Sequence, residues 1–137
     1  MKTTFALLVI LITGTGCATT PIPTNEATPG RILDGRYSQP LQDSGLVIVK
    51  RDNGLAGGAC SAKVFVDGLA VANLGIAEKA LLYLPIGEHV LSTQASGMCW
   101  GAISSEVVAN VQGNKSIAYR ISTDGNGGGF IIQRTAF

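Results

Sequence analysis

The stretch from Lys63 to Gly75 constrains this chain most, because it joins two apolar runs through an Asp67-Gly68 pair. A two-residue β-hairpin of type I′ needs positive φ at both central residues, which Asp and Gly tolerate well. Side chains alternate across a strand, so Val64 and Val66 are expected to share one buried face. The stretch therefore predicts a tight antiparallel hairpin that sets the register of its sheet.

Short apolar runs separated by turn residues continue along the rest of the chain. Besides the hairpin strands at 61–67 and 69–74, strands are expected at 46–51, 79–84, 88–95, 103–111, 117–121 and 130–134. These runs are rich in β-branched residues, and glycine, proline or asparagine lies between most of them. No stretch shows sustained helical periodicity. The predicted fold is all-β, a small antiparallel β-sandwich of about 7–8 strands.

The composition is that of an ordinary β-rich globular protein, with 46% hydrophobic and 14% charged residues. The formal net charge is +1, and long acidic or basic runs are absent from the sequence. We therefore expect no nucleic-acid partner. The glycine-rich stretches lack the strand-to-helix context of a phosphate cradle, so no cofactor is expected either.

The first 17 residues differ from the rest of the sequence. Lys2 is followed by an apolar run from Phe5 to Ile12 and then by small residues that lead to Cys17. The apolar run is too short to span a bilayer, which takes about 20 residues. Gly14-Thr15-Gly16-Cys17 resembles the lipobox of bacterial lipoproteins. The resemblance implies that Cys17 is acylated and becomes the mature first residue, and Ala18 after it implies sorting to the outer membrane.

This resemblance implies the domain organisation. Residues 1–16 would form a lipoprotein signal peptide, 17–44 a lipidated N-terminus with a Pro/Thr-rich flexible tether, and 45–137 the β-sandwich, which is expected to face the periplasm. Removal of residues 1–16 takes Lys2 from the ten basic residues, which leaves nine against nine acidic residues. Membrane attachment would then depend on the acyl chains and not on charge. Plain secretion with an unpaired Cys17 is the alternative.

Cys60 and Cys99 are the two remaining cysteines. In an oxidising compartment an even pair favours a disulfide. If the four strands between them alternate in direction, both cysteines lie at the same end of the sheet, as a bridge requires. A metal site with His89 is the alternative, but the CxxC and HxxxH spacings typical of such sites are missing. We expect the disulfide and no metal.

The segment from about 62 to 122 resembles the PEGA-type domain and related bacterial lipoproteins. The similarity rests on V-x-V-D-G at 64–68, L-P-x-G-x-H-x-L at 84–91 and V-x-G-N-K at 111–115. It implies a small antiparallel β-sandwich that presents a decorated surface and has no catalytic centre.

The cysteine pair also locates the candidate binding surface. Leu55, in the glycine-rich loop before Cys60, and Met98 and Trp100 beside Cys99 should lie at one end of the sheet. Exposed aromatic and apolar side chains are frequent at interaction hot spots. Trp100 has a structural alternative, since it could pack over the disulfide as part of the core.

His89 is the one histidine and the natural starting point for a hydrolase hypothesis. A Ser-His-Asp site would also need a serine in a nucleophile elbow, and the sequence has no G-x-S-x-G. We therefore expect a non-enzymatic envelope lipoprotein with a structural or accessory role. The alternative is a lipoprotein that binds or inhibits an envelope protein or glycan through the end that holds Cys60, Cys99 and Trp100.

Overall fold

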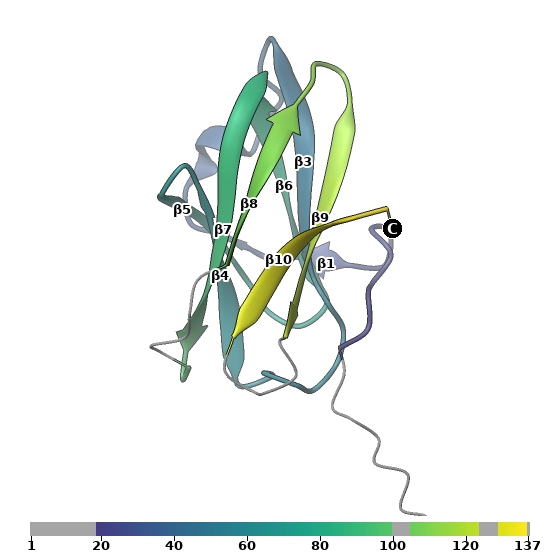
Figure 1. Ribbon diagram of the computed structural model, residues 1–137, viewed down its shortest axis with the longest axis vertical. Coiled ribbons are helices and arrows are strands. Elements are labelled where there is room, and N and C mark those ends of the chain that lie inside the picture. Colours follow the sequence, from purple (N-terminus) through teal and green to yellow (C-terminus); the bar gives the residue numbers. More distant parts are fainter. Residues whose placement is uncertain (1–18, 100–104, 124–128, 137) are drawn as a thin grey trace, which may run out of the picture.

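The computed structural model describes residues 19–99, 105–123 and 129–136. Figure 1 shows two sheets packed face to face, which confirms the predicted all-β sandwich. Each sheet has five strands, in the order β1-β6-β3-β9-β10 in the first sheet and β2-β5-β4-β7-β8 in the second. The first sheet is mixed, because β1 runs parallel to β6 and β3 runs parallel to β9.

Eight of the ten strands are those that the sequence predicts. They are β3 (Ser44–Arg51), β4 (Cys60–Val66), β5 (Leu69–Leu74), β6 (Glu78–Pro85), β7 (Gly87–Gly97), β8 (Ser105–Val111), β9 (Ser116–Thr123) and β10 (Phe130–Thr135). The first two residues expected in β8 lie outside the described residues. The other two strands, β1 (Thr28–Pro29) and β2 (Arg31–Ile32), are short and precede a 3₁₀ helix, η1 (Gly35–Tyr37).

The β4–β5 hairpin has the predicted turn. Asp67 and Gly68 have φ values of 49° and 82°. Val64 and Val66 point inward from β4 and are buried, whereas Lys63 points to the opposite face and is only partly buried. A type I′ turn matches the twist of the strands that it joins, so the local sequence is sufficient to specify this hairpin.

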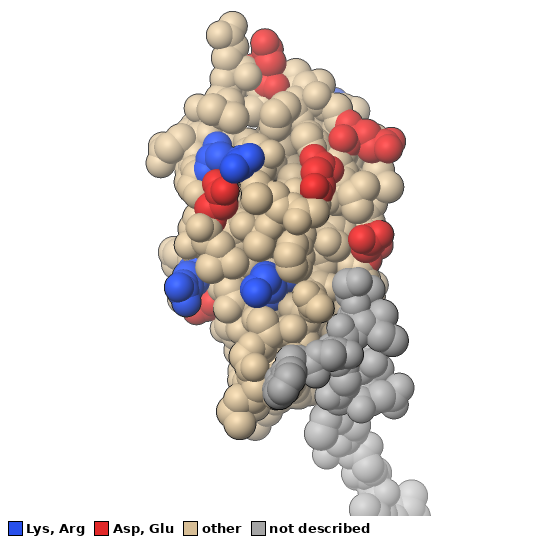
Figure 2. All heavy atoms as spheres, turned by 90° about the vertical axis from the view of Figure 1, so that its left-hand side faces the viewer, with Lys and Arg blue, Asp and Glu red and all other residues tan. Residues whose placement is uncertain are grey.

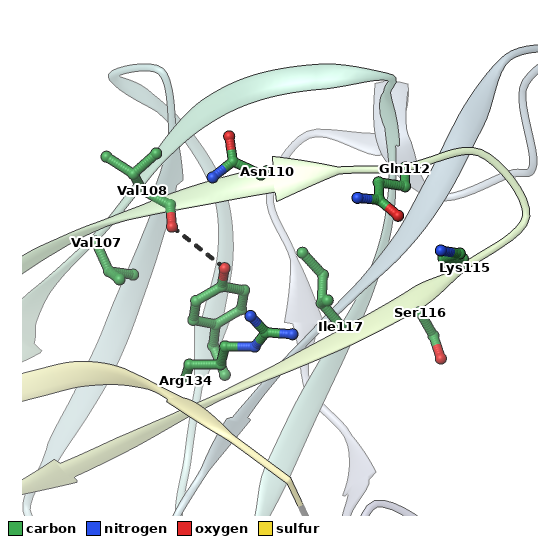
Figure 3. A pocket seen from close by; sticks show the side chains of 9 residues that line it. Val107, Val108, Asn110, Gln112, Lys115, Ser116, Ile117 and Arg134 are labelled. Carbon is green, nitrogen blue, oxygen red and sulfur yellow. Dashed lines mark hydrogen bonds between the residues drawn. The ribbon is translucent and has the colours of Figure 1, made fainter.

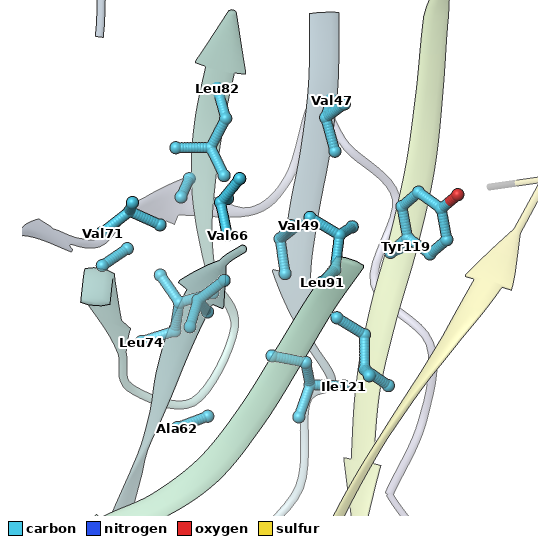
Figure 4. Packing of buried hydrophobic residues seen from close by; sticks show 14 of the residues in the cluster. Val47, Val49, Ala62, Val66, Val71, Leu74, Leu82, Leu91, Tyr119 and Ile121 are labelled. Atoms are coloured by element: carbon cyan, nitrogen blue, oxygen red, sulfur yellow. The ribbon is translucent and has the colours of Figure 1, made fainter. Parts of the chain in front are cut away.

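The core lies between the two sheets, as Figure 4 shows. It consists mainly of valine, leucine, isoleucine and alanine, with Tyr119 and Phe130 toward β10. β5 belongs to the second sheet and β6 to the first, so the chain crosses the sandwich between them. The four strands from 61 to 95 therefore do not form one continuous sheet, but β4 and β7 still pair and bring Cys60 opposite Gly97.

The expectation of a flexible tether up to residue 44 is wrong for residues 19–44, which fold against the sandwich. Thr20 forms an antiparallel bridge with Asn53, β1 pairs with β6, and β2 pairs with β5. Ile22 and Ala27 are buried. The physical reason is that this segment covers polar side chains on the outer face of the first sheet: the Lys50 ammonium donates to the Ile22 carbonyl at 2.8 Å.

Candidate functional site

A disulfide joins Cys60 and Cys99, as the sequence predicts, with the Cα atoms 5.3 Å apart. β4 begins at Cys60 and pairs with the end of β7, so the register itself brings the two cysteines together. Both sulfurs are engaged in this bond, which rules out the alternative of thiolate ligands for a metal at these positions. Among the described residues, no group of three or more His, Cys, Asp or Glu side chains could hold a metal ion.

We name the region around this bond the disulfide end; it comprises residues 52–60, 97–99 and 121–123. Leu55 and Met98 both lie there and are 92% and 82% exposed, so these two candidate surface residues are free of the core. Trp100 and Cys17, the other residues singled out in the sequence, lie outside the described residues. The structure thus brings Leu55 and Met98 to one end of the molecule.

Arg51 organises the disulfide end, and sequence reasoning did not identify it. Its side chain is buried on the core side of β3, where the guanidinium donates to the carbonyls of Gly57 at 2.7 Å, Cys60 at 2.5 Å and Leu74 at 3.2 Å. The guanidinium carbon also lies 4.6 Å from the centre of the Phe130 ring. Burial lowers the pKa of Arg51, but a guanidinium stays protonated at any ordinary pH. The residue fixes the glycine-rich loop to β4 and β5.

A second polar cluster lies on the outer face of the first sheet, beneath the N-terminal segment. The buried Asp52 carboxylate pairs with Arg120 and accepts a hydrogen bond from the Thr19 hydroxyl at 3.0 Å. Burial lowers the pKa of neighbouring Lys50, while the charge of Asp52 opposes that effect. Every one of these charged groups has a partner within the protein, which is the arrangement of a structural cluster.

His89 is held by Asp67 at the other end of the molecule. Its Nδ1 lies 2.6 Å from the Asp67 carboxylate, and its Nε2 lies 2.9 Å from the Pro85 carbonyl oxygen. Asp67 also accepts the Val90 amide at 2.8 Å. The bonds from His89 and Val90 lower the pKa of Asp67. Two acceptors face the two ring nitrogens, and among the described residues neither nitrogen has a hydroxyl partner to activate.

A hollow lies on the flank of the molecule between β8 and β9 (Figure 3). We call it the β8–β9 notch. Its volume is about 410 Å³. The Tyr119 hydroxyl reaches across it and donates to the Val108 carbonyl at 3.3 Å. Val107 and Ile117 supply apolar surface, and neither side chain is fully buried.

The β8–β9 notch is also lined by two cations, Lys115 and Arg134. Neither forms an ion pair with a described residue. Burial raises the pKa of Tyr119, while the charge of Arg134 acts in the opposite direction. A hollow with apolar walls, free cations and a hydroxyl can receive an anionic group attached to an apolar one.

The sequence contained a sign of this site that we did not use. Phe130 and Ile132 point into the core, and Arg134 follows at the same inward parity of β10. An arginine at a position where the alternation predicts a core residue indicates that the strand extends past the edge of the sheet that faces it. The Val-Gln-Gly-Asn-Lys stretch before β9 was used only for the resemblance to the PEGA-type domain, and not as a sign of a cationic site.

The face that lies to the left in Figure 1 has no cluster of like charges among the residues that the structure describes. Figure 2 shows acidic and basic side chains scattered over that face, singly or as small groups in which opposite charges touch, with uncharged surface between these groups. Within the described residues there is also no helix of sufficient length and hydropathy to cross a membrane.

Comparisons with protein-family models, with curated proteins and with solved structures found no match for this chain. The functional argument therefore depends on the site geometry described above.

Proposed function

We propose that this protein is a lipid-anchored, non-enzymatic accessory protein of the bacterial outer membrane, with its sandwich on the periplasmic side. The observation that carries this proposal is the bridge between Thr20 and Asn53, with both backbone hydrogen bonds at 2.8 and 2.9 Å. It fixes the start of the folded domain close to Cys17, the residue expected to carry the lipid.

Chain length then sets how far the domain can stand from the membrane. Only Ala18 separates Cys17 from Thr19, whose hydroxyl is bonded to Asp52. Two residues of extended chain reach at most about 7 Å. A lipid on Cys17 would therefore hold the disulfide end against the membrane surface, instead of suspending the domain on a long tether.

The exposed apolar side chains at this end agree with such an orientation. Leu55 and Met98 are the two most exposed large apolar residues described, and apolar side chains of this kind insert into the boundary between head groups and acyl chains. The alternative function, binding of an envelope protein or glycan through Leu55, Met98 and Trp100, would require the same end to be accessible. Membrane contact at this end favours the accessory role over that alternative.

The hydrogen bonds of His89 support a role without catalysis. The imidazole is committed to Asp67 and to the Pro85 carbonyl, so it stabilises the turns at that end, and it has no serine or threonine partner among the described residues. A serine or threonine nucleophile needs its hydroxyl within about 3 Å of the base.

The test is the membrane association of the Cys17→Ser variant. We expect the variant to move to the soluble periplasmic fraction, because the acyl chains supply the attachment. The Cys60→Ala/Cys99→Ala double variant is the matched control, since it removes two sulfurs but keeps Cys17, and it should stay with the membrane. Persistence of Cys17→Ser in the membrane fraction would overturn the proposal.

A further inference from the structure

The outer edge of β8 is free in the described part of the structure. β8 is the last strand of the second sheet and pairs only with β7. The Val108 carbonyl points away from β7, because it accepts the hydrogen bond from Tyr119 across the notch. Backbone groups alternate in direction along an antiparallel ladder, so the amide of Val108 and both backbone groups of Asn110 also face the notch. A free edge of this kind can accept an added strand.

The notch is closed at one end and narrowed at the other. The turn at 112–115 joins β8 to β9, and its residues Gln112 and Lys115 line the notch, so the turn closes that end. At the opposite end β10 leans toward β8, where the Ile132 amide donates to the Ser105 hydroxyl at 3.3 Å. A strand that adds to β8 and runs toward the turn must therefore end inside the notch.

The charges of the notch select which chain end fits there. Lys115 lies at the turn that closes it, Arg134 lies beside Tyr119, and neither has an ion-pair partner among the described residues. The acidic residue of β8, Glu106, is exposed and does not line the notch. Two cations favour a terminal carboxylate over a terminal amine.

We propose that the β8–β9 notch binds the carboxyl end of an extended peptide. The peptide adds to the free edge of β8 through Val108 and Asn110. Its terminal carboxylate lies between Lys115 and Arg134, and its last side chain, an apolar one, packs against Val107 and Ile117. This site lies on the flank of the sandwich and does not depend on lipidation of Cys17.

Affinity selection tests the proposal directly. The immobilised domain, residues 17–137 with Cys17→Ser, is offered a degenerate library of N-acetylated hexapeptides in which free acids and mass-tagged C-terminal amides are equally abundant. We expect the retained peptides to be free acids with an apolar last residue, enriched about tenfold over the amides, because the carboxylate makes charge-assisted hydrogen bonds. Equal retention of acids and amides, or no retention of free acids, would overturn the proposal.

An additional arm separates the chain end from an acidic side chain. Amidated peptides that carry aspartate at the last position present a carboxylate without a free terminus. Retention of these peptides at the level of the free acids would overturn recognition of a chain end and indicate a side-chain carboxylate as the ligand.

Two variants locate the binding site. Lys115→Gln/Arg134→Gln should abolish the preference for free acids, whereas Lys63→Gln, which removes one cation from β4 outside the notch, should preserve it. Val108→Pro removes an amide that faces the notch and keeps the pairing with β7, so it should weaken binding about tenfold. Amide spectra of each variant establish that the fold is retained. Unchanged selection by the folded Lys115→Gln/Arg134→Gln variant would contradict the assignment.

Discussion

The disulfide end and the β8–β9 notch both contain cationic side chains beside an aromatic ring, but they use them in opposite ways. At the disulfide end, Arg51 is buried and donates to three backbone carbonyls next to Phe130. In the notch, Arg134 is exposed near Tyr119 and has no ion-pair partner among the described residues. One arginine completes the fold, and the other is available to a ligand.

This difference follows from the cost of burying charge. A buried cation is tolerated only where acceptors surround it, so its removal leaves those acceptors unsatisfied. A cation at the rim of a hollow keeps its hydration, and the fold has no need of it. Substitutions of the buried arginine at the disulfide end should therefore lower stability, and substitutions of the notch cations should lower ligand binding.

The largest expected effect comes from Arg51→Met, a change that keeps the length of the side chain and removes its donors. It leaves the carbonyls of Gly57, Cys60 and Leu74 without their partner, and we expect a loss of about 3–5 kcal/mol in the free energy of unfolding. Arg134→Met is the matched control and should change stability by less than about 0.5 kcal/mol. Urea unfolding measures both, and equal losses would break the comparison.

The disulfide ranks second. Cys60 and Cys99 are 39 residues apart in sequence, and Cys60→Ala/Cys99→Ala should lower the free energy of unfolding by about 2–4 kcal/mol. Peptide retention by the folded variant should not change, because the notch lies away from this end. Urea unfolding and affinity selection are the two measurements; a loss of peptide retention at full folding would show that the two regions are coupled.

The sequence predicted the elements governed by local rules. Alternation and turn residues located eight strands, and the Asp67-Gly68 turn has the positive φ values that its chemistry requires. The disulfide was predictable from an even pair of cysteines in the expected oxidising compartment, together with strand directions that place Cys60 and Cys99 at one end. These features depend on residues that are close in the sequence, or on the alternation of side chains and of strand directions.

What the sequence did not predict depends on contacts between distant residues. Ile22 and Ala27 are isolated apolar residues in a proline-rich stretch, so only the outer face of the first sheet explains their burial. The parallel pairing of β3 with β9 joins strands that are far apart along the chain. The notch requires β10 to diverge from β8, which no local pattern encodes.

The ion pair between His89 and Asp67 should contribute less to the free energy of unfolding than Arg51 or the disulfide, and more than the two cations of the notch. Its folded-state bonds lower the pKa of Asp67; the contribution is therefore present above the usual pKa of about 3.9 and is lost as the pH falls through the folded-state value. Asp67→Asn keeps a residue that tolerates positive φ. Because Asp67 is about half exposed, the variant should lose only about 0.5 kcal/mol at pH 5.

The measurement for this pair is urea unfolding as a function of pH. The stability of wild type should approach that of Asp67→Asn as the pH falls through the lowered pKa of Asp67, below which its carboxyl is protonated in both the folded and the unfolded states. Both proteins keep Gly68 and a residue at position 67 that tolerates positive φ, so a pH-dependent difference in stability reports on the charge of Asp67 and not on the turn. A constant difference between the two proteins down to the lowest pH would show that the turn, and not the charge, is responsible.

The smallest effect concerns the two notch cations in the absence of a ligand. Lys115 and Arg134 line the same hollow and repel one another weakly, so salt should stabilise wild type by a few tenths of a kcal/mol relative to Lys115→Gln/Arg134→Gln. Unfolding midpoints at low and high salt measure this difference, and Lys63→Gln shows the effect of removing one positive charge outside the notch. If the double variant is instead clearly less stable than wild type at every salt concentration, the two cations belong to the fold, and the contrast with Arg51 fails.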